Sequence, residues 1–424
     1  MIKAIFAVSF LAITQLTMSG IDPDYNIPCK TASYSQSIRT VMMYHAGNEL
    51  APAYLELNGP GNLELRFDDL RGDFRNLYYT VFHCTSDWDY SDIDQSEYLE
   101  GMYENSINDY EQAFNTYTDF THYTCSFPND MSSLLLSGNY LMVVYEDGDV
   151  ENVVLTHRFI VYEQLVNVTP NIHQSTIVTE QRYDQEIDVT VSHTSYDIPN
   201  PYNDFDLVIL QNNRWDNAIV NLKPRFVKND ELDFDYGEEN NFRGGNEFRN
   251  VDLKNTDFVT LQIDHYSKVD DEFHAWLKPV PSRAFIRYQT FRDINGRYLI
   301  RNDDGFNSHL EADYIWVHFT LPWDYPLPNG SSMHVFGALS NWQALLEFAL
   351  AYDYNEKAYK AAIQLKQGYY DYQYVIKSGE EIDATLVEGN HFETENEYTI
   401  FAYNYEMTRN YDRVVGAVFF NSFD

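Results

Sequence analysis

One long stretch of the chain has no basic residue and is rich in carboxylates. Residues 76–157 hold 15 Asp and Glu side chains and no Lys or Arg. Nine of these carboxylates fall within 87–111, where they alternate with aromatic residues such as Trp88, Tyr98 and Tyr103. Aromatic anchors inside a polar rim are what protein interfaces need, so this segment is a candidate recognition surface for a protein partner. The alternative is a solvated acidic loop, which runs of like charge usually form.

The residues expected to contact such a partner are acidic and aromatic side chains of this segment. They are Asp87, Trp88, Asp92, Asp94, Glu97, Tyr98, Tyr103 and Glu104. Oxygen ligands also recur at alternate positions in 87–94, as they do in calcium-binding loops. The segment lacks the central Gly and the terminal Glu of an EF-hand loop, and we therefore predict no calcium there.

Two pairings of His with Cys raise the question of zinc. They are His83-Cys84 and His122-x-x-Cys125. Adjacent residues on a strand point to opposite faces, so His83 and Cys84 are poorly placed to share one metal. We expect either a disulfide between Cys84 and Cys125 or two buried thiols, which leaves Cys29 over. No metal and no other cofactor is predicted.

The sequence motifs of the common enzyme classes are missing. There is no Gly-x-Ser-x-Gly nucleophile elbow, no His-Glu-x-x-His pair and no glycine-rich phosphate loop. Paired carboxylates are abundant, but a glycosidase needs two of them at a set separation, which a sequence does not reveal. We predict no catalytic residues and no enzymatic activity.

Short strands must position these side chains, because the hydrophobic period is two almost everywhere. Leu63, Leu65 and Phe67 alternate with polar residues, and Gly, Asn and Asp turns bound this run and later ones. Further expected strands are 78–84, 139–145, 156–162, 187–191, 206–210, 258–263, 285–288, 314–321, 334–336, 361–365, 369–376, 398–403 and 414–420. The stretch 234–250, rich in Gly, Asn and charge, is expected to be a long surface loop.

This pattern predicts an all-β protein of three consecutive antiparallel β-sandwich domains of the immunoglobulin-like or early-set kind. The expected domains are 30–163, 164–292 and 308–424. Aromatic content supports this, since 35 Tyr and 27 Phe suit half-buried pleated surfaces. Helix signals are weak.

Charge and the N-terminal pattern restrict the function and location. The 424 residues carry a formal charge of −37, which repels phosphate backbones and anionic lipid, so nucleic-acid binding and lipid docking are not expected. Lys3, the apolar run 4–13 and the small residues Ser19-Gly20 form the pattern of a secretory signal peptide over 1–20. No later run is long and apolar enough to span a bilayer. We expect an exported protein in an oxidising compartment, with no direct membrane insertion.

Several strings along the chain resemble one family. They are 65–70 (LRFDDL), 82–88 (FHCTSDW), 97–101 (EYLEG), 114–116 (FNT), 117–123 (YTDFTHY), 127–129 (FPN), 137–140 (SGNY), 157–159 (HRF), 336–337 (FG), 367–375 (QGYYDYQYV) and 389–398 (GNHFETENEY). In this order they resemble the plug protein of the type IX secretion system of Bacteroidota. The resemblance implies a non-catalytic periplasmic protein that caps the periplasmic opening of the outer-membrane translocon barrel, which would be its partner.

The C-terminal region also resembles early-set sandwich modules, some of which bind glycogen. Residues 335–342, ending in Trp342, and residues 368–375 look like the Gly-x-Phe-x-x-Trp and Gly-x-Tyr-x-Tyr pattern of those modules. In such relatives the matching Trp can stack on sugar. No second Trp follows in this chain, so glycan binding through Trp342 is the alternative function and not the expected one.

Overall fold

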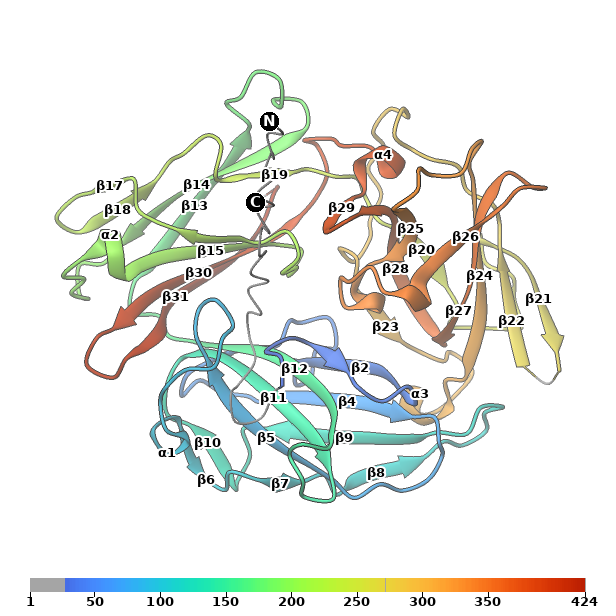
Figure 1. The fold of residues 1–424 in the computed structure, drawn as a ribbon, viewed down its shortest axis with the longest axis horizontal. Coiled ribbons are helices and arrows are strands. Elements are labelled where there is room, and N and C mark those ends of the chain that lie inside the picture. The colour runs from blue at the N-terminus through green and yellow to red at the C-terminus, as the bar shows by residue number, and fades with distance from the viewer. Residues whose placement is uncertain (1–26, 271, 424) are drawn as a thin grey trace, which may run out of the picture.

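The computed structural model describes residues 27–270 and 272–423, and the predicted signal peptide lies outside this range. Figure 1 shows three β-rich units arranged around a common centre. The first domain lies along the bottom of the view, the middle unit at upper left and the third unit at upper right. In the described residues, four short α-helices of four residues each connect strands: α1 (Gln95–Tyr98), α2 (Pro201–Asp204), α3 (Ser308–Glu311) and α4 (Thr385–Glu388). Within the described part of the chain no helix has the length and apolar character to span a membrane.

The first domain is a two-sheet sandwich. Its strands are β1 (Ala32–Ser33), β2 (Ile38–His45), β3 (Tyr54–Glu56), β4 (Leu63–Asp69), β5 (Leu77–Cys84), β6 (Leu99–Gly101), β7 (Asn105–Ser106), β8 (Asp109–Gln112), β9 (Thr121–Phe127), β10 (Ser132–Leu134), β11 (Gly138–Glu146) and β12 (Val153–Tyr162). One sheet has the order β1-β12-β11-β5-β7, with β3 parallel to β12, and the other has the order β2-β4-β9-β8. Alternation drives their packing, since Leu65 and Phe67 of one sheet meet Tyr79 and Val81 of the other in one core.

The middle unit is also a two-sheet sandwich, but one of its sheets is completed from the end of the chain. Its strands are β13 (Asn167–Gln174), β14 (Asp184–Ser192), β15 (Phe205–Gln211), β16 (Ile219–Leu222), β17 (Phe226–Val227), β18 (Glu231–Phe234), β19 (Asn241–Arg243), β30 (Glu397–Glu406) and β31 (Tyr411–Asn421). The first sheet has the order β13-β14-β18-β17, with β19 on β14, and the second has the order β16-β15-β30-β31. Ile187 and Val189 pack on Leu207, Ile209 and Ile400 between the sheets.

The third unit is one large sheet that curls almost into a barrel. Its strands are β20 (Arg249–Asp252), β21 (Ile263–Val269), β22 (Glu272–Leu277), β23 (Tyr298–Ile300), β24 (Tyr314–Pro322), β25 (Ser331–Phe336), β26 (Ala349–Asp353), β27 (Ala358–Lys366), β28 (Gly368–Ser378) and β29 (Glu381–Asp383). The order is β20-β28-β25-β26-β27-β24-β22-β21, with β23 and β29 also on β28. The sheet encloses its own core, in which Val317 and Phe319 face Val335 and Tyr374.

The prediction of three consecutive sandwiches is therefore only partly correct. The all-β, antiparallel character is confirmed, but β30 and β31 pair with β15 of the middle unit, and the third unit is not a simple sandwich. Alternation shows that a segment is a strand, but it does not show which strand it pairs with, because that depends on which apolar faces meet in space.

Three local predictions also differ from the structure. Residues 258–262 and 285–288 are loops, and their backbone is not paired with any strand. Their apolar side chains, such as Phe258 and Phe285, are exposed. The expected loop 234–250 instead contains β19 and the start of β20, and its Phe242 and Phe248 are buried.

Candidate functional site

All nine carboxylates of the segment 87–111 are exposed. From Asp92 to Glu111 the segment runs through α1, β6, β7 and β8, which Figure 1 shows at the side of the first domain away from the other two units. None of the nine forms an ion pair with a described Lys, Arg or His. Their contacts are polar and uncharged: Asp94 caps α1 by accepting from the Ser96 backbone N at 3.0 Å, and Glu104 accepts from the Tyr145 hydroxyl at 2.8 Å. We call residues 92–111 the acidic rim.

Two of the predicted aromatic contact residues are core residues. Trp88 is only 5% exposed; its ring lies edge-on to Trp215 of the middle unit, with 5.1 Å between centroids, and Arg158 sits 4.2 Å from its centroid. Tyr98 is 3% exposed and packs beside Tyr140. Both side chains contribute to packing, and neither is available to a partner from solvent.

The acidic rim has other exposed apolar side chains that the predicted contact set does not include. Tyr103 is 43% exposed, as predicted, and Met102 and Tyr110 are similarly open. Phe74 lies against Tyr110 with ring centroids 4.6 Å apart. The sequence shows aromatic residues among the carboxylates, but it does not show which of them are exposed, since Tyr98 is buried and Tyr110 is not. Aromatic and Met side chains, which are enriched at protein interfaces, are thus exposed among the carboxylates of this surface.

Asp87 lies elsewhere, at the contact with the middle unit. It accepts a hydrogen bond from the Asn221 side chain at 2.9 Å. The neighbouring Ser86 donates from its backbone N to Asp412 at 2.8 Å, which ties the same turn to the start of β31. The predicted contact set therefore divides between the acidic rim and a contact between units.

The first domain and the third unit are joined by a buried ionic centre. Lys366 donates to Asp68 at 2.6 Å, and both side chains are almost fully buried. Tyr314 and His122 also donate to Asp68, each at 2.6 Å. Lys366 in turn donates to the backbone oxygen of His309 at 2.7 Å. Burial alone would raise the pKa of the Asp68 carboxyl, but the charge of Lys366 and the His122 hydrogen bond hold it below its ordinary value. The charged centre therefore fastens the two units together.

A cavity of about 440 Å³ opens where all three units meet. Trp342 of the third unit and Trp215 of the middle unit both line it. Trp342 is half-buried: it packs edge-on against Phe336, with centroids 5.6 Å apart, and Arg214 lies 4.8 Å from its ring. The structure thus supplies the second Trp that the local sequence lacks, although Arg214 already occupies a face of Trp342.

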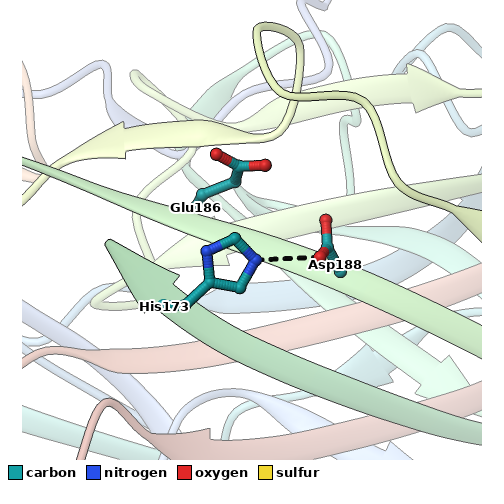
Figure 2. A group of neighbouring side chains, drawn as sticks. All are labelled: His173, Glu186 and Asp188. Atoms are coloured by element: carbon teal, nitrogen blue, oxygen red, sulfur yellow. Dashed lines mark hydrogen bonds and ion pairs between the residues drawn. The ribbon is translucent and has the colours of Figure 1, made fainter. Parts of the chain in front are cut away.

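Figure 2 shows a first group of side chains whose types could hold a metal, His173 on β13 with Glu186 and Asp188 on β14. His173 places Nε2 2.8 Å from Asp188 Oδ2 and Nδ1 2.8 Å from the Gln174 carbonyl oxygen. Both partners only accept hydrogen bonds, so the imidazolium form, with hydrogen on both ring nitrogens, satisfies both contacts. Although burial works against it, the Asp188 hydrogen bond raises the pKa of His173, which favours this imidazolium form. In that form the ring has no lone pair for a metal, and His173 and Asp188 are an ion pair.

A second group consists of carboxylates alone. Glu247, Asp293 and Glu395 bring oxygens within 4.8 Å of one another. Two backbone N–H groups donate to Asp293, at 2.5 and 3.0 Å, and the Tyr288 hydroxyl donates to Glu247. Burial raises the pKa of Glu247 to about 7, and the charge of Asp293 adds to this. A proton held by one of these carboxylates reduces the negative charge of the group. The group therefore attracts a cation less strongly.

The structure places Cys84 next to Cys29 and away from Cys125. Cys84 lies in the apolar layer between the first domain and the middle unit, together with Cys29, whereas Cys125 belongs to the core inside the first domain. His83 faces that inner core, 4.9 Å from Tyr140, so His83 and Cys84 do lie on opposite faces of β5. The geometry offers no shared zinc site to the two His–Cys pairings.

Comparison with known proteins concerns the first domain most directly. Residues 38–163 match the family model of the type 9 secretion system plug protein 1st domain. The match confirms the resemblance found in the sequence, and it covers the strands that build the sandwich and carry the acidic rim.

A solved structure is similar over almost the whole chain. It is the crystal structure of a hypothetical protein from Parabacteroides merdae ATCC 43184, with 29% sequence identity and a TM-score of 0.88. The similarity covers 92% of this chain and 99% of that chain. The overall fold is therefore shared over almost the whole of both chains. No curated protein matches this chain.

Proposed function

We propose that this protein is a non-catalytic plug that caps the periplasmic opening of the outer-membrane translocon of the type IX secretion system. The observation that carries the proposal is the match of residues 38–163 to the first domain of the plug protein family. A plug is periplasmic and reaches the outer membrane through its partner. It needs no cofactor, and its task is to occupy an opening and later leave it.

The contacts between the three units suit a rigid stopper. Besides the Asp68–Lys366 centre, Asp313 of the third unit accepts from the backbone N–H groups of Tyr117 and Thr118 at 2.6 and 3.1 Å. Tyr403 of the middle unit donates to Asn139 of the first domain at 2.7 Å. The first domain is thus held to each of the other two units by buried or partly buried polar contacts, and such contacts resist rearrangement because unpaired buried groups are costly.

The acidic rim suits a reversible contact. Exposed ion pairs with a basic partner are worth at most about 1 kcal/mol each and are screened by salt. A few exposed apolar side chains, among them Met102, Tyr103 and Tyr110, would supply desolvated anchors. Together, these weak ion pairs and apolar contacts would hold the plug in place without a covalent bond and still allow its release.

The experiment that tests the plug is affinity purification of the tagged protein from outer-membrane extract, followed by mass spectrometry. We expect the large barrel subunit of the translocon to co-purify. Deletion of the gene should let large antibiotics that the outer membrane normally excludes enter the cell. If deletion left both permeability and translocon composition unaltered, the plug function would be wrong.

The alternative is a glycan-binding protein, and one observation favours it: Trp215 and Trp342 line the same cavity. Because Arg214 covers part of the Trp342 ring, we expect no retardation in native gels cast with glycogen or starch. Retardation that Trp342→Ala abolishes would favour the glycan-binding function.

A further inference from the structure

We propose that Cys29 and Cys84 form a disulfide bond that fastens the N-terminal segment to the first domain. Their sulfur atoms lie 3.6 Å apart, and both side chains are buried in the layer between the first domain and the middle unit. A disulfide needs a sulfur–sulfur distance of about 2.0 Å, so the two atoms must approach by only about 1.5 Å. Of the two alternatives that the sequence left open, a Cys84–Cys125 disulfide does not fit, because these two cysteines lie in different cores.

The backbone on both sides holds the two cysteines in this position. Arg158 on β12 donates to the Cys29 carbonyl oxygen at 2.7 Å, and Thr156 donates to the Lys30 carbonyl oxygen at 2.6 Å. The chain then continues into β1, which pairs with β12. Cys84 ends β5 and is in register with Asn139 on β11. The closeness of the thiols therefore follows from the sheet and from hydrogen bonds around it.

The third cysteine is separated from this pair by the sheet itself. Side chains on one face of β11, such as Leu141, join the layer that contains Cys84, while those on the other face, such as Met142, join the core that contains Cys125. Cys125 on β9 packs inside that core. It therefore serves as an internal control, a buried thiol in the same domain that should stay free.

The bond forms by thiol–disulfide exchange with a small or protein disulfide as the oxidant. One cysteine thiolate attacks the oxidant disulfide, which breaks that bond and releases one oxidant thiol. The second cysteine thiolate then attacks the mixed disulfide, forms the Cys29–Cys84 bond and releases the second oxidant thiol. The two cysteine protons end on the two released thiols. Burial raises the pKa of the Cys84 thiol, so the exchange takes place during folding, before the layer closes.

In the cell the bond forms only if the protein is exported to an oxidising compartment, and such export is part of the proposed function. The bond closes a loop between positions 55 residues apart, and it crosslinks the start of the described chain to a central strand of the sandwich. Gln343 of the third unit also donates to the Thr31 carbonyl oxygen at 3.1 Å, so the fastened segment helps to tie the units together.

The test is independent of the plug function. The full chain is unfolded, reduced, refolded in a buffer of reduced and oxidised glutathione, denatured again with iodoacetamide present, and analysed by mass spectrometry. We expect one carbamidomethyl group, on Cys125, and a peptide pair linked through Cys29 and Cys84. The same pattern is expected in protein recovered from the cell envelope into iodoacetamide. Three carbamidomethylated cysteines in the refolded protein, or a link through Cys125, would overturn the proposal.

Matched variants separate the bond from simple packing. Reductant should lower the melting temperature of the wild type and of Cys125→Ala by about 5 °C or more. It should have no effect on Cys29→Ala, which cannot form the bond. Equal sensitivity of Cys29→Ala and the wild type would contradict the proposal. Loss of translocon co-purification with an intact link would count against the plug function and leave the disulfide standing.

Discussion

The acidic rim and the Asp68–Lys366 centre use the same kinds of charge in opposite surroundings. The rim has several carboxylates, all exposed and none in an ion pair among the described residues. The centre has one carboxylate and one ammonium group, both almost fully buried, and three donors converge on the carboxylate. In water a charge needs no partner, whereas in the interior an unpaired charge is costly. The comparison shows which charges of this acidic protein hold the fold and which are free for another task.

The largest expected effect comes from removing the cation of the buried centre. Lys366→Met leaves the Asp68 carboxylate buried with only two uncharged donors, and we expect a loss of about 3–5 kcal/mol in the free energy of unfolding. Urea denaturation measures it. Adding Asp68→Asn should restore part of the loss, because it removes the orphaned charge. A loss below about 1 kcal/mol, as for a surface pair, would contradict the contrast drawn between the two regions.

The next prediction compares truncation of a buried aromatic residue with truncation of an exposed one, both from the predicted contact set. Trp88→Ala removes a buried ring between two units and should cost about 3–5 kcal/mol of stability. Tyr103→Ala, at an exposed position, should change stability by about 0.5 kcal/mol or less but weaken binding to the translocon by about 1–2 kcal/mol. Denaturation and pull-down titration measure the two quantities. If Trp88→Ala weakened binding more than Tyr103→Ala and left stability unchanged, Trp88 would be a partner-contact residue.

A pH series tests the buried carboxylates that have no cation. The pKa of Glu247 in the folded state is raised to about 7, so the folded protein retains a proton that the unfolded chain has already lost. Stability should therefore fall as pH rises from about 4.5 through 7. Glu247→Gln should remove about 1–2 kcal/mol of this fall, as measured by urea unfolding at each pH.

Glu388 is the matched control for this series. Burial would raise its pKa, but Arg249 and Arg283 hold it below the ordinary value. Glu388→Gln should therefore lose stability at neutral pH, and the loss should shrink as pH falls and the wild-type carboxyl is protonated. Parallel pH curves for the wild type and Glu247→Gln would show that Glu247 titrates normally.

The smallest effect on stability is expected at the acidic rim. Asp92→Asn, Asp94→Asn and Glu104→Gln together should change the free energy of unfolding by about 0.5 kcal/mol or less per site, because the amides preserve the α1 cap and the Tyr145 contact. Binding to the translocon should weaken, and wild-type binding should weaken as salt increases.

A control with the same change in charge belongs on the middle unit. Asp230→Asn, Asp235→Asn and Glu238→Gln alter three exposed carboxylates there. This control should bind as the wild type does. Equal binding by the rim variant and the control would make the acidic rim a solvated loop.

The strands could be predicted because alternation is a local property. Residues 63–67, 78–84 and 139–145 all lie in strands of the structure, since each segment must bury one face whatever it pairs with. The two runs that failed, 258–263 and 285–288, are apolar but have no neighbouring strand along most of their length. The sequence also indicated the surface role of the acidic residues, because so many unpaired carboxylates cannot be buried.

Composition, local periodicity and the family strings thus determined the β class, the exposed acidic segment and the family of the first domain. Tertiary structure alone decided that β30 pairs with β15, that Trp88 and Tyr98 lie in cores, and that Cys84 faces Cys29 and not Cys125. The physical reason is that partners far apart in the chain meet only when whole apolar faces pack together. A side chain's type says what it can do, while the face on which it lies says what it meets.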